Sequence, residues 1–144
     1  MFNLKHIHLI FFIALSFIFI NNSLSQDSTI IGTWRIIRIE HCRRLVYPKA
    51  EAEVYTVTPS NAYMVFYKDH GTTKSNSFVF NNLSSFQWSQ HNDILIFRTQ
   101  SSERDSILKV KIEHISPSAI KIKRIFIEYR VGWDIWSDVY LEKY

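Results

Sequence analysis

The stretch Ile30-Ile31-Gly32-Thr33-Trp34 opens a run in which apolar and polar residues alternate as far as Glu40. Such alternation places successive side chains on opposite faces of a β-strand. The pattern recurs along the chain in short runs, and no segment of ten residues or more shows convincing helical periodicity. The further runs span residues 53–58, 62–68, 77–80, 85–90, 94–100, 106–115, 119–130 and 135–143.

Short turn sequences separate these runs. They are rich in Gly, Pro, Asn, Asp and Ser, for example Asn81-Asn82 and Ser116-Pro117-Ser118, and these residues favour tight turns. About eight or nine short strands at regular spacing predict an all-β domain, either an antiparallel barrel or a sandwich. Residues 41–52 fit the pattern least, and we expect a long loop or a short helix there, lying over one mouth of a barrel.

Residues 1–25 carry the three parts of a secretory signal peptide. Lys5 supplies a positive charge, residues 9–20 form an apolar run, and small serines stand at positions 23 and 25. A retained membrane anchor would require roughly 20 apolar residues, whereas Asn21-Asn22 ends this run early. We therefore expect cleavage before Gln26, a single domain over residues 26–144, no membrane span after cleavage, and a periplasmic or secreted protein.

Composition sets few limits on the partner. The chain has 17 basic and 13 acidic side chains, a formal net charge of +4, and this mild excess does not predict nucleic-acid binding. Cys42 is the single cysteine, so no intrachain disulfide can form and the core alone must hold the domain. This cysteine usage suits a bacterial periplasm better than an animal extracellular fluid.

Several segments follow one another in an order seen in a known family. Gly32-x-Trp34 stands just inside the first strand, residues 61–71 run into a Gly turn, Trp88 precedes a tight turn and an apolar strand, and residues 139–144 form a closing strand. This order resembles the small lipocalin-like domains common in exported proteins of Bacteroidetes, over residues 30–144. The resemblance implies a single antiparallel up-and-down β-barrel of about eight strands, of the lipocalin or calycin type.

The resemblance also implies a structural signature. Gly32 and Trp34 would belong to it, and the Trp34 ring would plug the closed end of the barrel. A cationic side chain from the last strand usually stacks on that tryptophan. Lys143 is the nearest match here, and Arg130 is the other choice.

Aromatic residues are numerous for one small barrel, and a subset could line a pocket for an apolar ligand. The alternative is that they form the core. Two tryptophans follow Gly132 in an expected loop, and exposed loop tryptophans often mark the rim of a binding site. The ligand-binding candidates for rim or pocket are Tyr63, Trp88, Phe97, Trp133 and Trp136.

A basic hairpin surrounds the turn at Pro117, with lysines that alternate with aliphatic residues and so share an outer face. It could bind an acidic partner, or it could be a solvated face that prevents edge pairing. No aromatic residue interleaves with these lysines, so we expect no nucleic-acid partner. The basic-patch residues are Lys109, Lys111, Lys121 and Lys123.

Chemistry-bearing motifs are sparse. His41-Cys42 lacks a second cysteine or a spaced histidine pair, so we expect no metal site. The chain has three glycines and neither a nucleophile elbow nor a phosphate-binding loop. We therefore expect no catalytic residues, no cofactor and no enzymatic activity.

Two functions remain. The first is an exported lipocalin-like protein that binds a small hydrophobic or amphipathic ligand, with Trp133, Trp136 and residues 41–52 at the rim of its open mouth; it predicts an interior cavity of a few hundred cubic ångströms. The second is an exported protein-binding module, such as an inhibitor, an immunity-type protein or an assembly subunit; it predicts a filled barrel. The resemblance favours the first.

Overall fold

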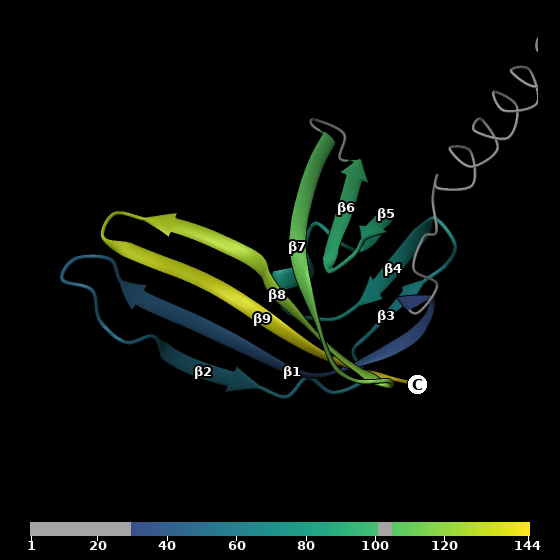
Figure 1. Ribbon diagram of the computed structural model, residues 1–144, viewed down its shortest axis with the longest axis horizontal. Coiled ribbons are helices and arrows are strands. Elements are labelled where there is room, and N and C mark those ends of the chain that lie inside the picture. The colour runs from purple at the N-terminus through teal and green to yellow at the C-terminus, as the bar shows by residue number, and fades with distance from the viewer. Residues whose placement is uncertain (1–29, 101–104) are drawn as a thin grey trace, which may run out of the picture.

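The computed structural model describes residues 30–100 and 105–144, so the expected signal peptide at residues 1–25 lies outside the described residues. Within these ranges the chain forms β-strands and one short 3-10 helix, η2 (Figure 1). The elements are β1 (Gly32–Leu45), β2 (Glu53–Val57), β3 (Tyr63–Phe66), β4 (His70–Lys74), η2 (Phe78–Phe80), β5 (Ser85–His91), β6 (Ile94–Gln100), β7 (Asp105–Ser116), β8 (Ala119–Arg130) and β9 (Trp133–Lys143).

The strands form one antiparallel sheet that closes on itself. The order is β2-β1-β3-β4-β5-β6-β7-β8-β9, and β1 also pairs with β9. Trp34 of β1 stands opposite Met64 of β3 on one side and Lys143 of β9 on the other. Leaving β2 aside, the eight other strands form the closed up-and-down barrel, which confirms the predicted fold class.

Part of the sheet extends beyond the barrel. The N-terminal part of β1 pairs with β3, whereas its later part, from Ile39 to Arg43, pairs with β2. On the other side, β8 pairs with β7 only as far as Lys123 but follows β9 to Arg130. We call the resulting four-stranded extension the arm: β2 with residues 39–45 of β1, 125–130 of β8 and 133–138 of β9. Figure 1 shows the arm projecting to the left, while β6 and β7 rise away from it.

Arg124 marks the point where β7 and β8 diverge. Its backbone has a φ of 55°, in the left-handed region, and the β8–β9 register shifts between Ile122 and Phe126. The carboxylate of Asp138 accepts a hydrogen bond from the Arg124 backbone N–H at 2.9 Å. This bulge bends β8 away from β7 and so opens the barrel on that side.

Side chains fill the interior of the closed half. The Phe66 ring makes edge contacts with Phe86 and Trp88, with centroids 5.6 and 5.4 Å away. Trp34 is buried, and its indole N–H donates to the Ile30 carbonyl at 2.7 Å. Among the other fully buried side chains of this core are Ile36, Met64, Leu95, Phe97, Ile112, Ile120, Ile122 and Leu141.

Trp34 and Lys143, two residues of the expected signature, lie close together. The Lys143 ammonium lies 5.6 Å from the Trp34 ring centroid, within the range of a cation–π contact. Gly32 has a φ of 132°, which an L side chain rarely adopts. The alternative cation, Arg130, lies at the far end of the arm and pairs with Glu128 instead.

The structure corrects the strand prediction in two places. Residues 77–80 are not a strand: Ser77 caps η2 by accepting a hydrogen bond from the Val79 N–H. Residues 70–74 form β4. The sequence pattern did not predict this strand, because the strand lacks large apolar side chains. In β4, Gly71 stands opposite Phe86, whose ring occupies the space that a side chain would need.

Two expected loops are strands instead. The segment after His41 was expected to be a loop or a short helix, but β1 continues to Leu45 before the chain turns. Trp133 and Trp136 were expected in a loop, yet both lie in β9. Cross-strand hydrogen bonding to β1 fixes both segments, since Leu45 stands opposite Trp133 and Cys42 opposite Trp136.

Candidate functional site

The five aromatic candidates do not meet in one pocket. Phe97 and Trp88 are buried in the barrel core, and the Trp88 indole N–H donates to the Tyr67 carbonyl at 2.8 Å. Tyr63 lies on the outer surface of β3. Trp133 and Trp136 lie on opposite faces of the arm, because they are three positions apart along one strand and successive side chains alternate.

The inner face of the arm continues the interior face of the barrel and carries an aromatic cluster. Tyr55, His41, Ser137 and Phe126 stand opposite one another across β2, β1, β9 and β8. The His41 ring stacks on Tyr55 and on Phe78 of η2, with centroids 6.3 and 5.2 Å away. Phe78 meets Phe126 edge to face at 5.3 Å. These rings form one surface from strands far apart in sequence.

His41 is held at the centre of this cluster. Its Nδ1 lies 2.9 Å from the Ser137 hydroxyl. Burial lowers the pKa of His41 below its ordinary value of 6.5, so the imidazole is neutral at pH 7 and packs as an aromatic ring. A shallow cleft of about 310 Å³ runs beside it, bounded among others by Tyr55 and Ile135.

Charged side chains border the cluster. The Arg43 guanidinium pairs with Glu53 at 2.6 Å and lies 5.6 Å from the Trp133 ring centroid. Tyr55 is 70% exposed and Phe78 is 53% exposed. The inner face of the arm therefore presents accessible rings beside an arginine, a combination that is enriched where proteins bind one another.

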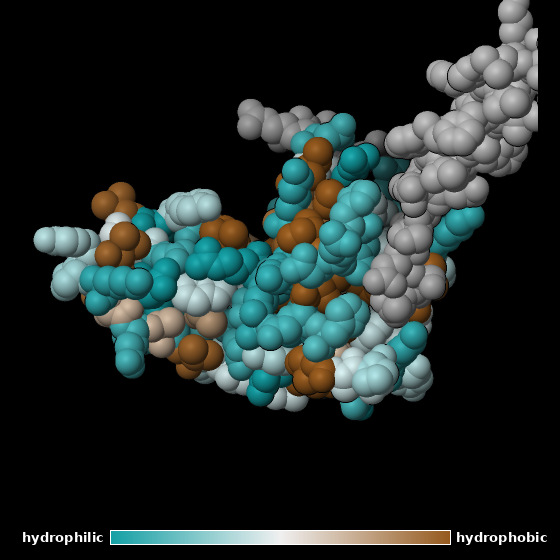
Figure 2. Space-filling model, viewed as in Figure 1, coloured by the Kyte–Doolittle hydropathy of each residue, from teal (hydrophilic) through white to brown (hydrophobic). Residues whose placement is uncertain are grey.

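The tip of the arm is also apolar. The Val46 N–H donates to the Gly132 carbonyl at 3.0 Å and so joins the two turns. Tyr47, Tyr129 and Val131 are almost fully exposed there. Figure 2 shows hydrophobic residues at the outer end of the arm, on the left. Most of the large apolar side chains that are more than half exposed, within the described ranges, lie on the arm or on η2.

The Trp136 ring, on the reverse face of the arm, contacts two arginine side chains. Its ring lies between the guanidinium groups of Arg124 and Arg44, at 4.7 and 5.6 Å from the centroid. Both arginines pair with Asp134, at 2.8 and 2.9 Å. Burial raises the pKa of Asp134, but the two arginines outweigh it and hold the pKa below its usual value. The Trp136 ring is therefore engaged with these two arginines.

The basic hairpin is largely neutralised. Lys111 pairs with Asp93 at 3.1 Å and Lys123 with Glu113 at 2.6 Å. Lys121 pairs with Asp138 at 2.9 Å and is mostly covered. Lys109 is exposed on β7. Three of the four lysines are thus in ion pairs, which fits the solvated interpretation better than a site for an acidic partner.

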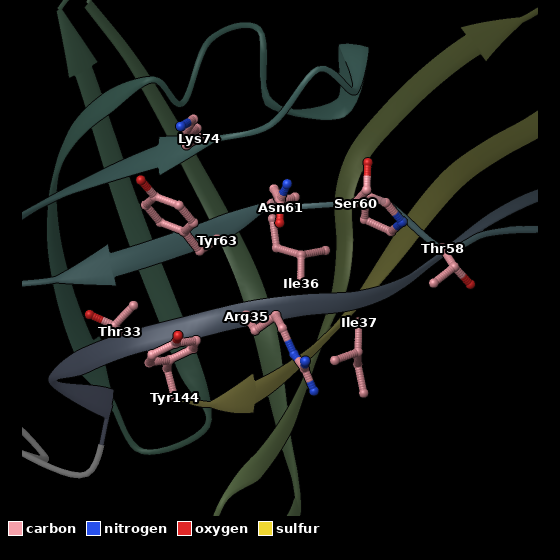
Figure 3. Close-up of a pocket in the computed structure, with 12 residues that line it drawn as sticks. Thr33, Arg35, Ile36, Ile37, Thr58, Ser60, Asn61, Tyr63, Lys74 and Tyr144 are labelled. Carbon is pink, nitrogen blue, oxygen red and sulfur yellow. The ribbon is translucent and has the colours of Figure 1, made fainter.

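An open groove of about 850 Å³ lies on the outer surface where β1 changes partner from β3 to β2 (Figure 3). Tyr63, Tyr144 and Arg35 line it, and both tyrosines lie to the left of Arg35 in this view. Arg35 pairs with Glu142 at 2.7 Å, and the Lys74 ammonium lies 5.8 Å from the Tyr63 centroid. The charged groups of this groove are therefore largely engaged with neighbouring side chains.

Metal and thiol chemistry find little support in the part of the chain that the structure describes. No group of three or more His, Cys, Asp or Glu side chains is placed to hold a metal ion there. Burial, reinforced by Asp138 and Glu40, raises the pKa of Cys42 to about 11, so the thiol is a poor nucleophile.

No helix among residues 30–100 and 105–144 has the length and hydropathy needed to cross a bilayer.

Comparisons with known proteins add no functional assignment: no protein-family model, no curated protein and no solved structure matches this chain significantly. The closed eight-stranded barrel is consistent with the lipocalin-like fold.

Sequence reasoning missed Tyr55 and Phe78, because their contacts with His41 form only when β2 and η2 come together in the folded chain.

Proposed function

We propose that this chain is an exported, lipocalin-like binding module that recognises another protein through the inner face of its arm. The observation that carries the proposal is the aromatic cluster of Tyr55, His41, Phe78 and Phe126, in which Tyr55 and Phe78 are exposed while His41 and Phe126 are half-buried. Exposed rings of this kind are costly to leave in water and mark interaction sites when they are contiguous.

The shape of this surface favours a protein over a small molecule. A small-molecule site encloses most of its ligand, whereas the inner face of the arm is open and the closed half of the barrel is filled by Trp34, Phe66 and Phe97. Aromatic and arginine side chains are the usual energetic centres of protein interfaces. Trp133 and Arg43, beside the cluster, extend the surface with that chemistry.

A small hydrophobic or amphipathic ligand is the second candidate function. The outer groove beside Tyr63 favours it, because about 850 Å³ is within the size range of ligand sites. In that case the groove, rather than the barrel interior, would hold the ligand.

Affinity capture with matched variants tests the proposal. The tagged protein is incubated with an extract of its own host. A double variant, Phe78→Ser with Trp133→Ser, is treated in the same way and alters η2 and the inner face of the arm. Ile107→Ser is the control, since Ile107 is 63% exposed on β7, away from the arm. We expect a polypeptide that the protein and the control retain and the double variant loses.

Two results would contradict this. Equal capture by all three proteins would place the contact elsewhere. Native mass spectrometry that shows a bound molecule of a few hundred daltons and no polypeptide would favour the small-ligand alternative, and loss of that mass on Tyr63→Ala would place it in the outer groove.

A further inference from the structure

The outer edge of the arm at β2 is unpaired within the described chain. β2 pairs with β1 along one side, and no other described strand pairs with it. Its residues from Glu53 to Thr56 are exposed, including Val54 at 56%. An exposed strand edge carries backbone N–H and C=O groups that can pair with another strand, so this edge is competent to extend the sheet.

Apart from its short length and Glu53, β2 lacks the devices that usually block edge pairing. Such devices are charged side chains, proline and bulges within the edge strand. Beyond Glu53, β2 reads Val54-Tyr55-Thr56-Val57, and all four residue types favour strands. The opposite edge of the arm, on β8, is different, because the bulge at Arg124 and the charges of Glu128 and Arg130 lie along it.

We propose that β2 pairs with β2 of a second copy of this chain, antiparallel, about a two-fold axis at Tyr55. Antiparallel pairing about this axis sets Tyr55 opposite Tyr55, Val54 opposite Thr56 and Glu53 opposite Val57 of the other copy. No like charges face each other, and aromatic and β-branched pairs are the favourable cross-strand pairs.

Self-pairing through β8 meets the same condition only at some positions of the axis. An axis at Glu128 would set two glutamates opposite each other, and an axis at Ile127 would set Arg124 opposite Arg130. Like charges directly opposite are destabilising. An axis at Tyr129 would instead set Glu128 opposite Arg130, so like charges alone do not separate the two edges. The bulge at Arg124 and the Glu128–Arg130 ion pair along β8 are the features that favour β2. A two-fold contact through β2 closes after two copies.

The dimer would join the two arms into one continuous sheet. A two-fold axis perpendicular to the sheet keeps both inner faces on the same side. The two Tyr55 rings would then bridge two aromatic clusters, each stacked on its own His41. The proposal stands on the free edge of β2 and holds whatever the inner face binds.

Sedimentation velocity over a concentration series tests the pairing. We expect the purified protein to pass from monomer to dimer as its concentration rises. Tyr55→Lys sets two lysines opposite each other and should weaken the dimer by about tenfold or more. Tyr129→Lys on the β8 edge, where the side chain is 86% exposed, is the matched control and should leave the dimer unchanged.

A cross-link tests the register. Residues opposite each other in antiparallel strands have Cα atoms about 4.5–5.5 Å apart, within the range of about 4.4–6.8 Å that a disulfide spans, so Tyr55→Cys should yield a disulfide-linked dimer on mild oxidation. A protein that stays monomeric at every concentration, a dimer that survives Tyr55→Lys, or a failure of Tyr55→Cys to cross-link would overturn the proposal. Partner capture by the double variant Phe78→Ser with Trp133→Ser tests only binding through the inner face of the arm. The dimer proposal and the proposed function can therefore fail separately.

Discussion

Replacement of Trp34 by alanine tests the closed end of the barrel. The ring is 1% exposed, its N–H donates to the Ile30 carbonyl at 2.7 Å, and Lys143 lies over it at 5.6 Å. Removal of a buried tryptophan costs about 3–5 kcal/mol. The orphaned Ile30 carbonyl adds roughly 1 kcal/mol and the lost cation–π contact about 0.5–1 kcal/mol. Because these effects overlap, we expect a loss of about 4–5 kcal/mol in the free energy of unfolding.

Urea denaturation followed by far-UV circular dichroism measures this loss without relying on tryptophan emission. Trp34→Phe keeps most of the ring volume and should lose about 1–2 kcal/mol, chiefly through the unpaired carbonyl. Trp133→Ala on the partly exposed arm is the control and should cost less than Trp34→Ala. If Trp34→Ala unfolds within about 1 kcal/mol of the parent and with the same denaturant slope, Trp34 does not plug the barrel.

Three other perturbations follow from single contacts. Burial lowers the pKa of His41 below 6.5. The free energy of unfolding should therefore fall as pH drops through 6.5, and it should level off below the folded-state pKa. Denaturation measured at several pH values should show this profile flattened in His41→Gln. With a pKa of about 11 against an ordinary 9.0, Cys42 should react with a thiol reagent at pH 8 about a hundredfold more slowly in the folded than in the unfolded protein. In Gly71→Ala the new Cβ would overlap the Phe86 ring and lie 2.6 Å from the Val65 carbonyl, so thermal unfolding should show a loss of about 2 kcal/mol or more.

The sequence predicts the closed half of the barrel well, because its strands bury one face and leave the other in water. Residues 30–40 therefore alternate, and Trp34 is buried where the signature places it. The arm is different. Along His41-Cys42-Arg43-Arg44 both faces of the strand carry polar or charged groups, so the alternation fades although the backbone stays extended.

The candidate site was harder to predict for a related reason. Trp133 and Trp136 look adjacent in sequence, but a strand sends them to opposite faces. The run Phe78-Val79-Phe80 is apolar throughout and too short to reveal a period, and the Ser77 cap decides for a helical turn. The partners of His41 come from β2, β9 and η2, so only the folded chain brings them together.

The divergence of β7 and β8 at Arg124 also has a consequence for how the molecule opens. The closed half is bounded by strands paired on both sides, whereas the arm ends in β2 on one side and β8 on the other. Segments with fewer buried contacts open at lower free energy than the core. Amide hydrogens of the arm should therefore exchange with solvent through a local opening. Those beside Trp34 should exchange only through global unfolding. One continuous sheet would then behave as two cooperative units, with the boundary at a single left-handed residue.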